Sequence, residues 1–274
     1  MSEFHARSIA EKVDISNFRL LSLDEYDDSA FINRITTWTH NKLPVNMVMC
    51  HFQLRHFTST LFHHFDISLP NQILKSVSKR QAEFLAGRVA AQKVMQQEFP
   101  HEFIQQIKIS KNRAPDWPQG YCGSISHTEN MAVSIASRVD QFDSLGVDLE
   151  GYLSPEVSAE IAHQIHSAEE ILLLNANGVP NNRATTLIFS AKESLFKALY
   201  KYVNEFFGFE SAFVDDIDLE ASTIYLVLEE NFRKRNQLRA SYMCHFSFLD
   251  EGVLTIVSIP SKGIRGKTTL EISL

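Results

Sequence analysis

The chain has 274 residues, of which 44% are hydrophobic and 22% charged, and its formal net charge is −7. This length can form one large domain or two small ones, each with a hydrophobic core. The negative charge argues against a broad nucleic-acid-binding surface, because such a surface must be basic to neutralise phosphates. We therefore expect a protein that does not bind nucleic acid. Local clusters of basic residues are still compatible with a small phosphate-bearing ligand.

Cysteine usage and the N-terminal segment indicate the compartment. Cys50, Cys122 and Cys244 are far apart, and none forms a C-x-x-C pair, so neither a disulfide framework nor a zinc site is predicted. The N-terminal residues lack the apolar run of a signal peptide. No stretch approaches the ~18 apolar residues that cross a bilayer. We expect a cytoplasmic protein without a transmembrane segment.

The first half of the chain predicts one long helix among strands. Residues 1–45 have no clear pattern, whereas residues 76–99 carry apolar positions near helical spacing and are followed by Pro100. Residues 112–123 are rich in proline and glycine and predict a loop. Strands are predicted by apolar, β-prone segments at 45–52, 107–110, 124–127 and 131–137.

The second half repeats this composition. A capping box at Ser167–Glu170 predicts a helix start, and a longer helix is predicted over 184–202. Strands are predicted at 145–150, 224–228, 242–249 and 253–259, with a hairpin turn joining the last two.

The order of elements predicts the fold class. Each half contains a long helix and several strands, and the order is not the regular βαβ alternation of a parallel sheet. We predict an α+β fold of two similar subdomains related by pseudo-twofold symmetry, each with an antiparallel sheet packed against a long helix. The expected boundary divides the chain into residues 1–144 and 145–274. Two such halves in one chain make a monomer the expected state.

Two acidic segments could carry chemistry. In Gly146-Val147-Asp148-Leu149-Glu150, strand alternation places Asp148 and Glu150 on one face, where two carboxylates suit a hard cation such as Mg²⁺. On the predicted helix, Glu193 and Lys197 are neighbours at i,i+4. Each segment also has a simple structural interpretation, namely a solvated strand face and a surface ion pair.

Polar and basic residues in the first half offer a complementary set. Ser126 and His127 end a predicted strand, where they could contact a ligand or only stabilise the fold. Arginine forks match phosphate oxygens, although each arginine taken alone is also compatible with a solvated surface. The candidate arginines are Arg80, Arg88 and Arg113.

The order of these motifs resembles the 4′-phosphopantetheinyl transferase superfamily. The resemblance begins at the KRQAEFLAGRVAAQ segment from Lys79 and includes Trp117-Pro118. It continues through the G-S-I-S-H strand, the G-V-D-L-E strand and the F-S-A-K-E-S-L-F-K helix to Tyr200. It is strongest to the surfactin-type branch and, within it, to the enterobactin synthetase component D group, which shares Phe189 before Ser190. The first 45 and the last 70 residues match only in general character.

The resemblance implies an enzyme that moves the phosphopantetheine arm of coenzyme A onto a serine of a carrier protein and releases 3′,5′-ADP. Asp148, Glu150 and Glu193 would hold Mg²⁺ against the pyrophosphate. Glu193 would also help to remove the serine proton, directly or through water, and Lys197 would stabilise the departing phosphate. Asp148, Glu193 and Lys197 are thus the implied catalytic residues.

The remaining implied roles concern coenzyme A. His127 and Lys192 would contact phosphates, as would Lys197, and Ser126 would lie beside the same ligand. The arginines would bind the 3′-phosphate and adenine end, namely Arg80, Arg88 and Arg113.

The resemblance implies acyl, aryl or peptidyl carrier domains as partners, with siderophore-type nonribosomal peptide synthetases as expected clients. A transferase for fatty-acid carrier protein is a second possibility, disfavoured by the length of this chain. A third is a non-catalytic module of the same fold that binds coenzyme A or carriers.

The basic run at 233–239 is expected to be solvated, although an acidic carrier could dock on it. Four histidines close in sequence match no metal-ligand spacing and are expected to be structural or solvated, namely His51, His56, His63 and His64.

Overall fold

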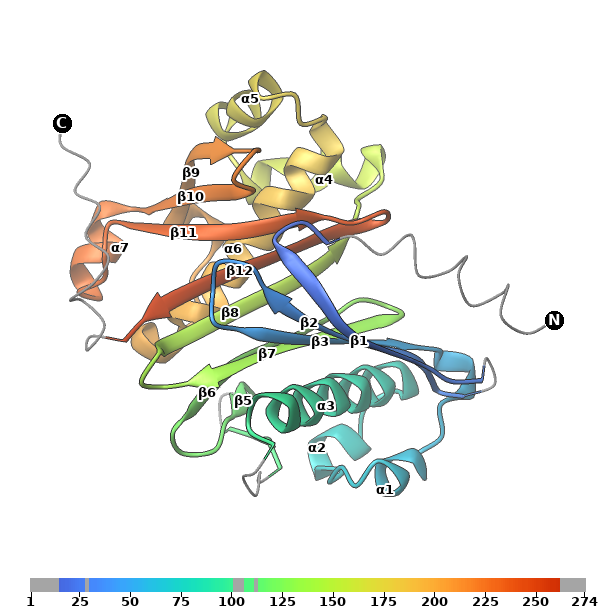
Figure 1. The fold of residues 1–274 in the computed structure, drawn as a ribbon. Coiled ribbons are helices and arrows are strands. Elements are labelled where there is room, and N and C mark those ends of the chain that lie inside the picture. The colour runs from blue at the N-terminus through green and yellow to red at the C-terminus, as the bar shows by residue number, and fades with distance from the viewer. Residues whose placement is uncertain (1–14, 28–29, 101–105, 111–112, 262–274) are drawn as a thin grey trace.

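The computed structural model describes residues 15–27, 30–100, 106–110 and 113–261 (Figure 1). Two five-stranded antiparallel sheets form its centre. The first sheet has the order β1-β2-β3-β7-β6, and the second has the order β8-β12-β11-β10-β9. The first comprises β1 (Phe18–Glu25), β2 (Ile32–His40), β3 (Asn46–Phe52), β7 (Met131–Arg138) and β6 (Tyr121–His127). The second comprises β8 (Phe142–Gly151), β12 (Gly252–Pro260), β11 (Ser241–Phe248), β10 (Thr223–Leu228) and β9 (Ala212–Asp218).

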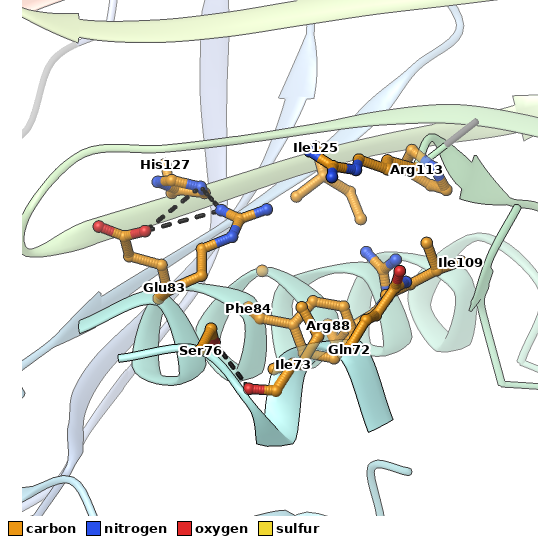
Figure 2. A pocket seen from close by; sticks show the side chains of 13 residues that line it. Gln72, Ile73, Ser76, Glu83, Phe84, Arg88, Ile109, Arg113, Ile125 and His127 are labelled. Carbon is orange, nitrogen blue, oxygen red and sulfur yellow. Dashed lines mark hydrogen bonds and ion pairs between the residues drawn. The ribbon is translucent and has the colours of Figure 1, made fainter. Parts of the chain in front are cut away.

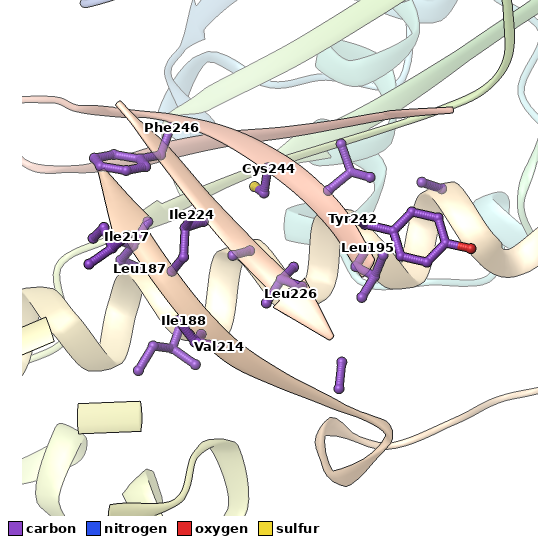
Figure 3. Packing of buried hydrophobic residues seen from close by; sticks show 14 of the residues in the cluster. Leu187, Ile188, Leu195, Val214, Ile217, Ile224, Leu226, Tyr242, Cys244 and Phe246 are labelled. Carbon is purple, nitrogen blue, oxygen red and sulfur yellow. The ribbon is translucent and has the colours of Figure 1, made fainter. Parts of the chain in front are cut away.

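One long helix packs on each sheet. Helix α3 (Ser78–Glu98) shares a hydrophobic core with the first sheet, and α6 (Asn181–Val203) shares one with the second. In Figure 3, Leu187, Ile188 and Leu195 of α6 lie against the second sheet. The α+β fold of two similar sheet–helix subdomains is thus confirmed. The first sheet with α3 is the N-terminal subdomain below, and the second sheet with α6 is the C-terminal subdomain.

A third core lies between the two sheets. It contains Trp38 and Met47 from the first sheet and Val147, Leu149 and Ile256 from the second, each at most 1% exposed. The chain therefore forms four layers, with α3 and α6 outside two facing sheets. Strand β8 lies at this interface, and the predicted boundary at residue 144 falls within it and stays a prediction.

Gly146 brings α6 close to β8. A Cβ at this position would lie 1.9 Å from the Ser194 carbonyl oxygen, so only glycine allows this approach. The close contact sets the distance between β8, which carries Asp148 and Glu150, and α6, which carries Glu193.

The predicted helices over 76–99 and 184–202 are confirmed with small shifts of their ends, as are the predicted capping box and the final hairpin. The predicted loop at 112–123 was wrong in part, because it contains β5 (Pro115–Asp116), which pairs with β4 (Lys108–Ile109), and the first residues of β6. Strands β1, β2 and β9 were not predicted.

The remaining helices are α1 (Leu61–His64), α2 (Asn71–Leu74), α4 (Pro155–Ile165), α5 (Ala168–Ala176) and α7 (Glu230–Arg235), with 3-10 turns η1 (Leu54–His56) and η2 (Phe209–Ser211). None of the helices in the described ranges is both long and apolar enough to cross a membrane.

Candidate active site

Asp148 is the centre of a polar network at the subdomain interface. Its side chain projects from β8 and is almost fully buried. Oδ1 accepts a hydrogen bond from Ser126 Oγ of β6 at 2.8 Å, and Oδ2 accepts one from Ser190 Oγ of α6 at 2.8 Å. Both carboxylate oxygens are therefore held by donors from two other elements, as a buried charge requires.

Lys197 completes this network. Its Nζ lies 2.6 Å from Asp148 Oδ1 and also donates to Val147 O at 2.9 Å and to Ser126 Oγ at 3.0 Å. An ammonium has three protons, so these contacts account for its full donor capacity. One cation thus links the N-terminal subdomain, through Ser126, to both acidic motifs of the C-terminal subdomain.

The negative charge of Asp148 affects both Glu150 and Glu193. Burial and the nearby Asp148 raise the pKa of Glu150 to about 8, with Lys197 acting in the opposite direction. Burial and Asp148 also raise the pKa of Glu193. The three carboxylates therefore repel one another, and a bound cation would relieve that repulsion.

The carboxylates are not arranged as a ready metal site. Within the described residues, no three Asp, Glu, His or Cys side chains lie together in a way that could hold a metal ion. Asp148 Oδ1 is instead paired with Lys197. The donor chemistry still fits Mg²⁺, because three carboxylates with excess negative charge are oxygen ligands suited to a hard divalent cation.

His127 and Arg80 lie beside this network on the N-terminal side. Arg80 Nη1 and His127 Nε2 are 2.8 Å apart, and Glu83 Oε2 lies 3.6 Å from Arg80 Nη1. Burial lowers the pKa of His127, and Glu83 opposes this shift. A neutral His127 accepts the Arg80 hydrogen bond at Nε2, which leaves its other nitrogen as the donor.

A cavity of about 390 Å³ opens between α3 and β6 (Figure 2). Arg80, Arg88, Arg113 and His127 all line it. Arg113 adopts a positive φ of 67°. Three guanidinium groups around one hollow favour an anionic ligand with several oxygens.

Arg88 is the most buried of these arginines, with 7% of its surface exposed. It stacks on the Phe84 ring at 4.6 Å and donates Nη2 to Lys108 O at 3.2 Å. Burial and the nearby Arg80 lower its pKa to about 10. Its Nε has no hydrogen-bond partner in the described part of the chain. A buried cation with unused donor capacity is typical of a ligand-binding group.

Lys192 does not lie with the residues that line the cavity. Its Nζ lies 2.8 Å from Glu170 Oε1, and only 3% of the lysine side chain is exposed. It projects into the interior of the C-terminal subdomain, although its neighbour in sequence is Glu193.

A second hollow of about 570 Å³ adjoins Lys197. Aromatic side chains from both subdomains line it, and sequence reasoning assigned no role to the aromatics of its C-terminal wall. Phe206 on this wall is 83% exposed, which is unusual for a phenylalanine. The lining aromatics are Trp117, Tyr121, Phe196, Tyr200 and Phe206.

The molecule is an α+β protein with an arginine-lined cavity and, at its subdomain interface, a buried Asp148–Lys197 ion pair. The sequence model of the 4′-phosphopantetheinyl transferase N-terminal domain matches residues 70–137, and that of the 4′-phosphopantetheinyl transferase superfamily matches residues 144–257. The two matches lie on either side of the subdomain interface. The chain belongs to the 4′-phosphopantetheinyl transferase superfamily, which confirms the resemblance drawn from its motifs.

Curated relatives agree with this assignment. Enterobactin synthase component D of Salmonella typhi is 34% identical over 175 residues, which cover 62% of this chain and 71% of that protein. The protein of the same name from Escherichia coli K12 is 34% identical over 163 residues, covering 58% and 75%. The 4′-phosphopantetheinyl transferase Npt of Nocardia iowensis is 27% identical over 146 residues, covering 52% and 62%.

Proposed function

We propose that this chain transfers the phosphopantetheine arm of coenzyme A to a serine of carrier domains in a siderophore-type nonribosomal peptide synthetase. The observation that carries the proposal is the Ser126–Asp148–Lys197 network. It joins both subdomains, and Asp148 and Lys197 of this network influence the pKa values of Glu150 and Glu193. Ser126 precedes His127, which lines the cationic cavity. The similarity to enterobactin synthase component D supports the siderophore clients.

The cavity suits the nucleotide end of coenzyme A. We assign its 3′-phosphate to Arg80, Arg88 and Arg113, because guanidinium groups donate paired hydrogen bonds to phosphate oxygens. His127 lines this cavity, and the charges of both Arg80 and Asp148 influence its pKa. We assign His127 to the pyrophosphate.

Asp148, Glu150 and Glu193 would hold Mg²⁺ when the pyrophosphate is present. The ion would neutralise the phosphates and favour attack by a nucleophile. Ser126 and Ser190 orient Asp148 for this role by donating to its two oxygens.

Proton transfer falls to Glu193. The carrier serine Oγ attacks the β-phosphorus of coenzyme A, and the bond from that phosphorus to the bridging oxygen breaks. Glu193 accepts the serine proton, directly or through water, and its raised pKa brings it nearer to working pH. Lys197 stabilises the negative charge that remains on the leaving 3′,5′-ADP.

Intact-protein mass spectrometry tests the proposal. An apo peptidyl carrier domain is incubated with this protein, coenzyme A and Mg²⁺, with parallel samples that contain an acyl carrier protein. A gain of one phosphopantetheine on the peptidyl carrier supports the proposal, and a preference for the acyl carrier would point to fatty-acid synthesis. No gain on any carrier, with coenzyme A still bound, would favour a non-catalytic module of the same fold.

A further inference from the structure

A buried ion pair lies one residue from the proposed base. Lys192 Nζ and Glu170 Oε1 are 2.8 Å apart, and their side chains are 3% and 2% exposed. Such a pair loses much hydration on burial, so it persists only where further hydrogen bonds satisfy both groups.

Both groups are satisfied by backbone from several elements. Lys192 Nζ donates to Ile165 O at the end of α4 at 2.8 Å and to Phe209 O in η2 at 3.3 Å. Glu170 Oε2 accepts from Ser167 N at 2.8 Å, and its Oε1 accepts from Val214 N of β9 at 2.9 Å. The pair therefore ties α4, α5, η2 and β9 to one position on α6.

The position of this tie matters because of helix geometry. Successive residues of a helix point about 100° apart around its axis. A contact that fixes the rotation of α6 at Lys192 therefore also fixes the direction in which Glu193 leaves the helix. Lys192 and Glu193 both line a small hollow of about 50 Å³ with Phe206, Phe207 and residues of η2. The tie thus holds both the helix that carries Glu193 and the aromatic segment beside it.

We infer that Lys192, clamped by Glu170, is a positioning residue that sets the direction of Glu193 and holds the 206–209 segment, rather than a ligand of coenzyme A phosphates. This inference rests on the proposed function. It differs from the phosphate contact that the family resemblance implies for Lys192. A phosphate could reach Nζ only after the contacts to Glu170, Ile165 O and Phe209 O had opened.

Three variants separate the possibilities: Lys192→Met, Glu170→Gln and the double variant. Each is first checked for folding by circular dichroism and urea unfolding and is then assayed at a temperature where it is fully folded. Binding of coenzyme A with Mg²⁺ is measured by calorimetry, and kcat and KM are measured with an apo carrier. The pair Lys234–Glu230 on α7, which is exposed, provides Lys234→Met with Glu230→Gln as the control cycle for unfolding.

A positioning role predicts a split between kcat and binding. We expect Lys192→Met and Glu170→Gln each to lower kcat about tenfold or more while the Kd for coenzyme A changes less than threefold. The double variant should unfold at higher urea than Lys192→Met, because it leaves no unpaired buried charge, whereas the exposed control cycle should show no such coupling.

Two results would overturn the inference. A Kd for coenzyme A at least tenfold weaker in Lys192→Met, with Glu170→Gln binding normally, would make Lys192 a phosphate ligand. A normal kcat in all three folded variants would make the pair purely structural. Failure of the proposed function would look different, since the wild-type protein itself would then transfer nothing to any carrier. In that case the effect of Lys192 on Glu193 could not be measured through kcat. The clamp would then be tested by urea unfolding alone, and additive effects of Lys192→Met and Glu170→Gln on the free energy of unfolding would overturn it.

Discussion

Lys197 Nζ lies 2.6 Å from Asp148 Oδ1, and this ion pair joins α6 to β8 at the interface of the two subdomains. Only 3% of the Asp148 side chain is exposed, against 25% for Lys197. The carboxylate is therefore fixed in the interior, while the ammonium reaches the surface of the site. The pair connects the two acidic motifs that lie far apart in the sequence.

The first prediction concerns Asp148. Replacing it with asparagine keeps the shape but removes the charge that holds Lys197 and that would bind a cation. We expect the rate of phosphopantetheine transfer to fall about 100-fold or more, as for other preorganised electrostatic groups. Intact-protein mass spectrometry over time measures the rate. Asp250→Asn, on the exposed turn between β11 and β12, is the control and should behave as wild type. A rate within threefold of wild type for Asp148→Asn would contradict the assigned role.

The second prediction concerns the divalent cation. Chelation of Mg²⁺ should abolish transfer, and Glu150→Gln should raise the Mg²⁺ concentration for half-maximal rate about tenfold or more, because one oxygen-ligand charge is lost. A titration of the rate with Mg²⁺ checks this. Glu98→Gln is a matched control, since burial also raises the pKa of Glu98, and this carboxylate accepts a hydrogen bond from Asn46 instead. Unchanged Mg²⁺ dependence in Glu150→Gln would exclude it as a ligand.

The third prediction concerns Arg88. Arg88→Met should raise the KM for coenzyme A about tenfold or more, because a hydrogen bond to a charged phosphate is lost. The same variant should change the KM for 3′-dephospho-coenzyme A far less. Steady-state kinetics with both substrates measures the difference, and Arg19→Met on the exposed β1 strand is the control. Equal effects on both substrates would place the 3′-phosphate elsewhere.

The fourth prediction concerns acid stability. His40 of β2 and His245 of β11 face each other with ring centroids 4.9 Å apart. His40 Nδ1 accepts from the backbone N–H groups of Lys42 and Leu43, so a second proton would break both bonds. Burial, the facing His245 and Lys42 lower the pKa of His40 to about 3, and burial with Lys42 lowers that of His245 to about 4.

The lowered pKa values of His40 and His245 make the folded protein less stable in acid. The unfolded chain binds protons near pH 6.5 while the folded chain does not, so the free energy of unfolding should fall as the pH drops from about 6.5 toward 4. Urea unfolding at several pH values measures this fall. His245→Phe should reduce its slope, and the exposed His63→Gln should not. An unchanged slope in His245→Phe would show that other groups control acid stability.

The fifth prediction concerns Gly146. Gly146→Ala should lower the free energy of unfolding by ~1–3 kcal/mol, because its Cβ would collide with the Ser194 carbonyl and separate β8 from α6. Transfer should fall as well, since the carboxylates of both elements move apart. Gly151→Ala, on the same strand, is the control, because the nearest atom to its Cβ would be 3.7 Å away. Urea unfolding and the carrier assay check both variants, and wild-type stability in Gly146→Ala would contradict the packing argument.

Much of the fold could be predicted because local patterns agree with the final packing. Helix α6 has an apolar face, α3 carries a run of apolar residues that Pro100 follows, and the capping box at Ser167 uses only neighbouring residues. Strands β1 and β9 could not be predicted in the same way. They are edge strands with many exposed residues, and their place in the sheets depends on pairing with β2 and β10.

The site shows the same division. The order of the motifs resembles that of the superfamily, and this resemblance indicated Asp148, Glu150, Glu193 and Lys197, whereas spacing alone left each segment with a structural interpretation. Lys192 was different, since a lysine beside a glutamate on a helix has no local sign of burial. Lys192 points inward because Glu170 of α5 lies beside it and forms a buried ion pair with it.

The two-part α+β plan could be predicted from periodicity and the order of elements, and the family and the candidate carboxylates from the resemblance of short motifs. The pairing of Lys197 with Asp148, the burial of Arg88 beside Phe84 and the clamping of Lys192 away from the cavity could not be predicted in this way. Burial and charge pairing depend on distances between elements. Those distances are set by packing of the whole chain, as at the contact of Gly146 with α6.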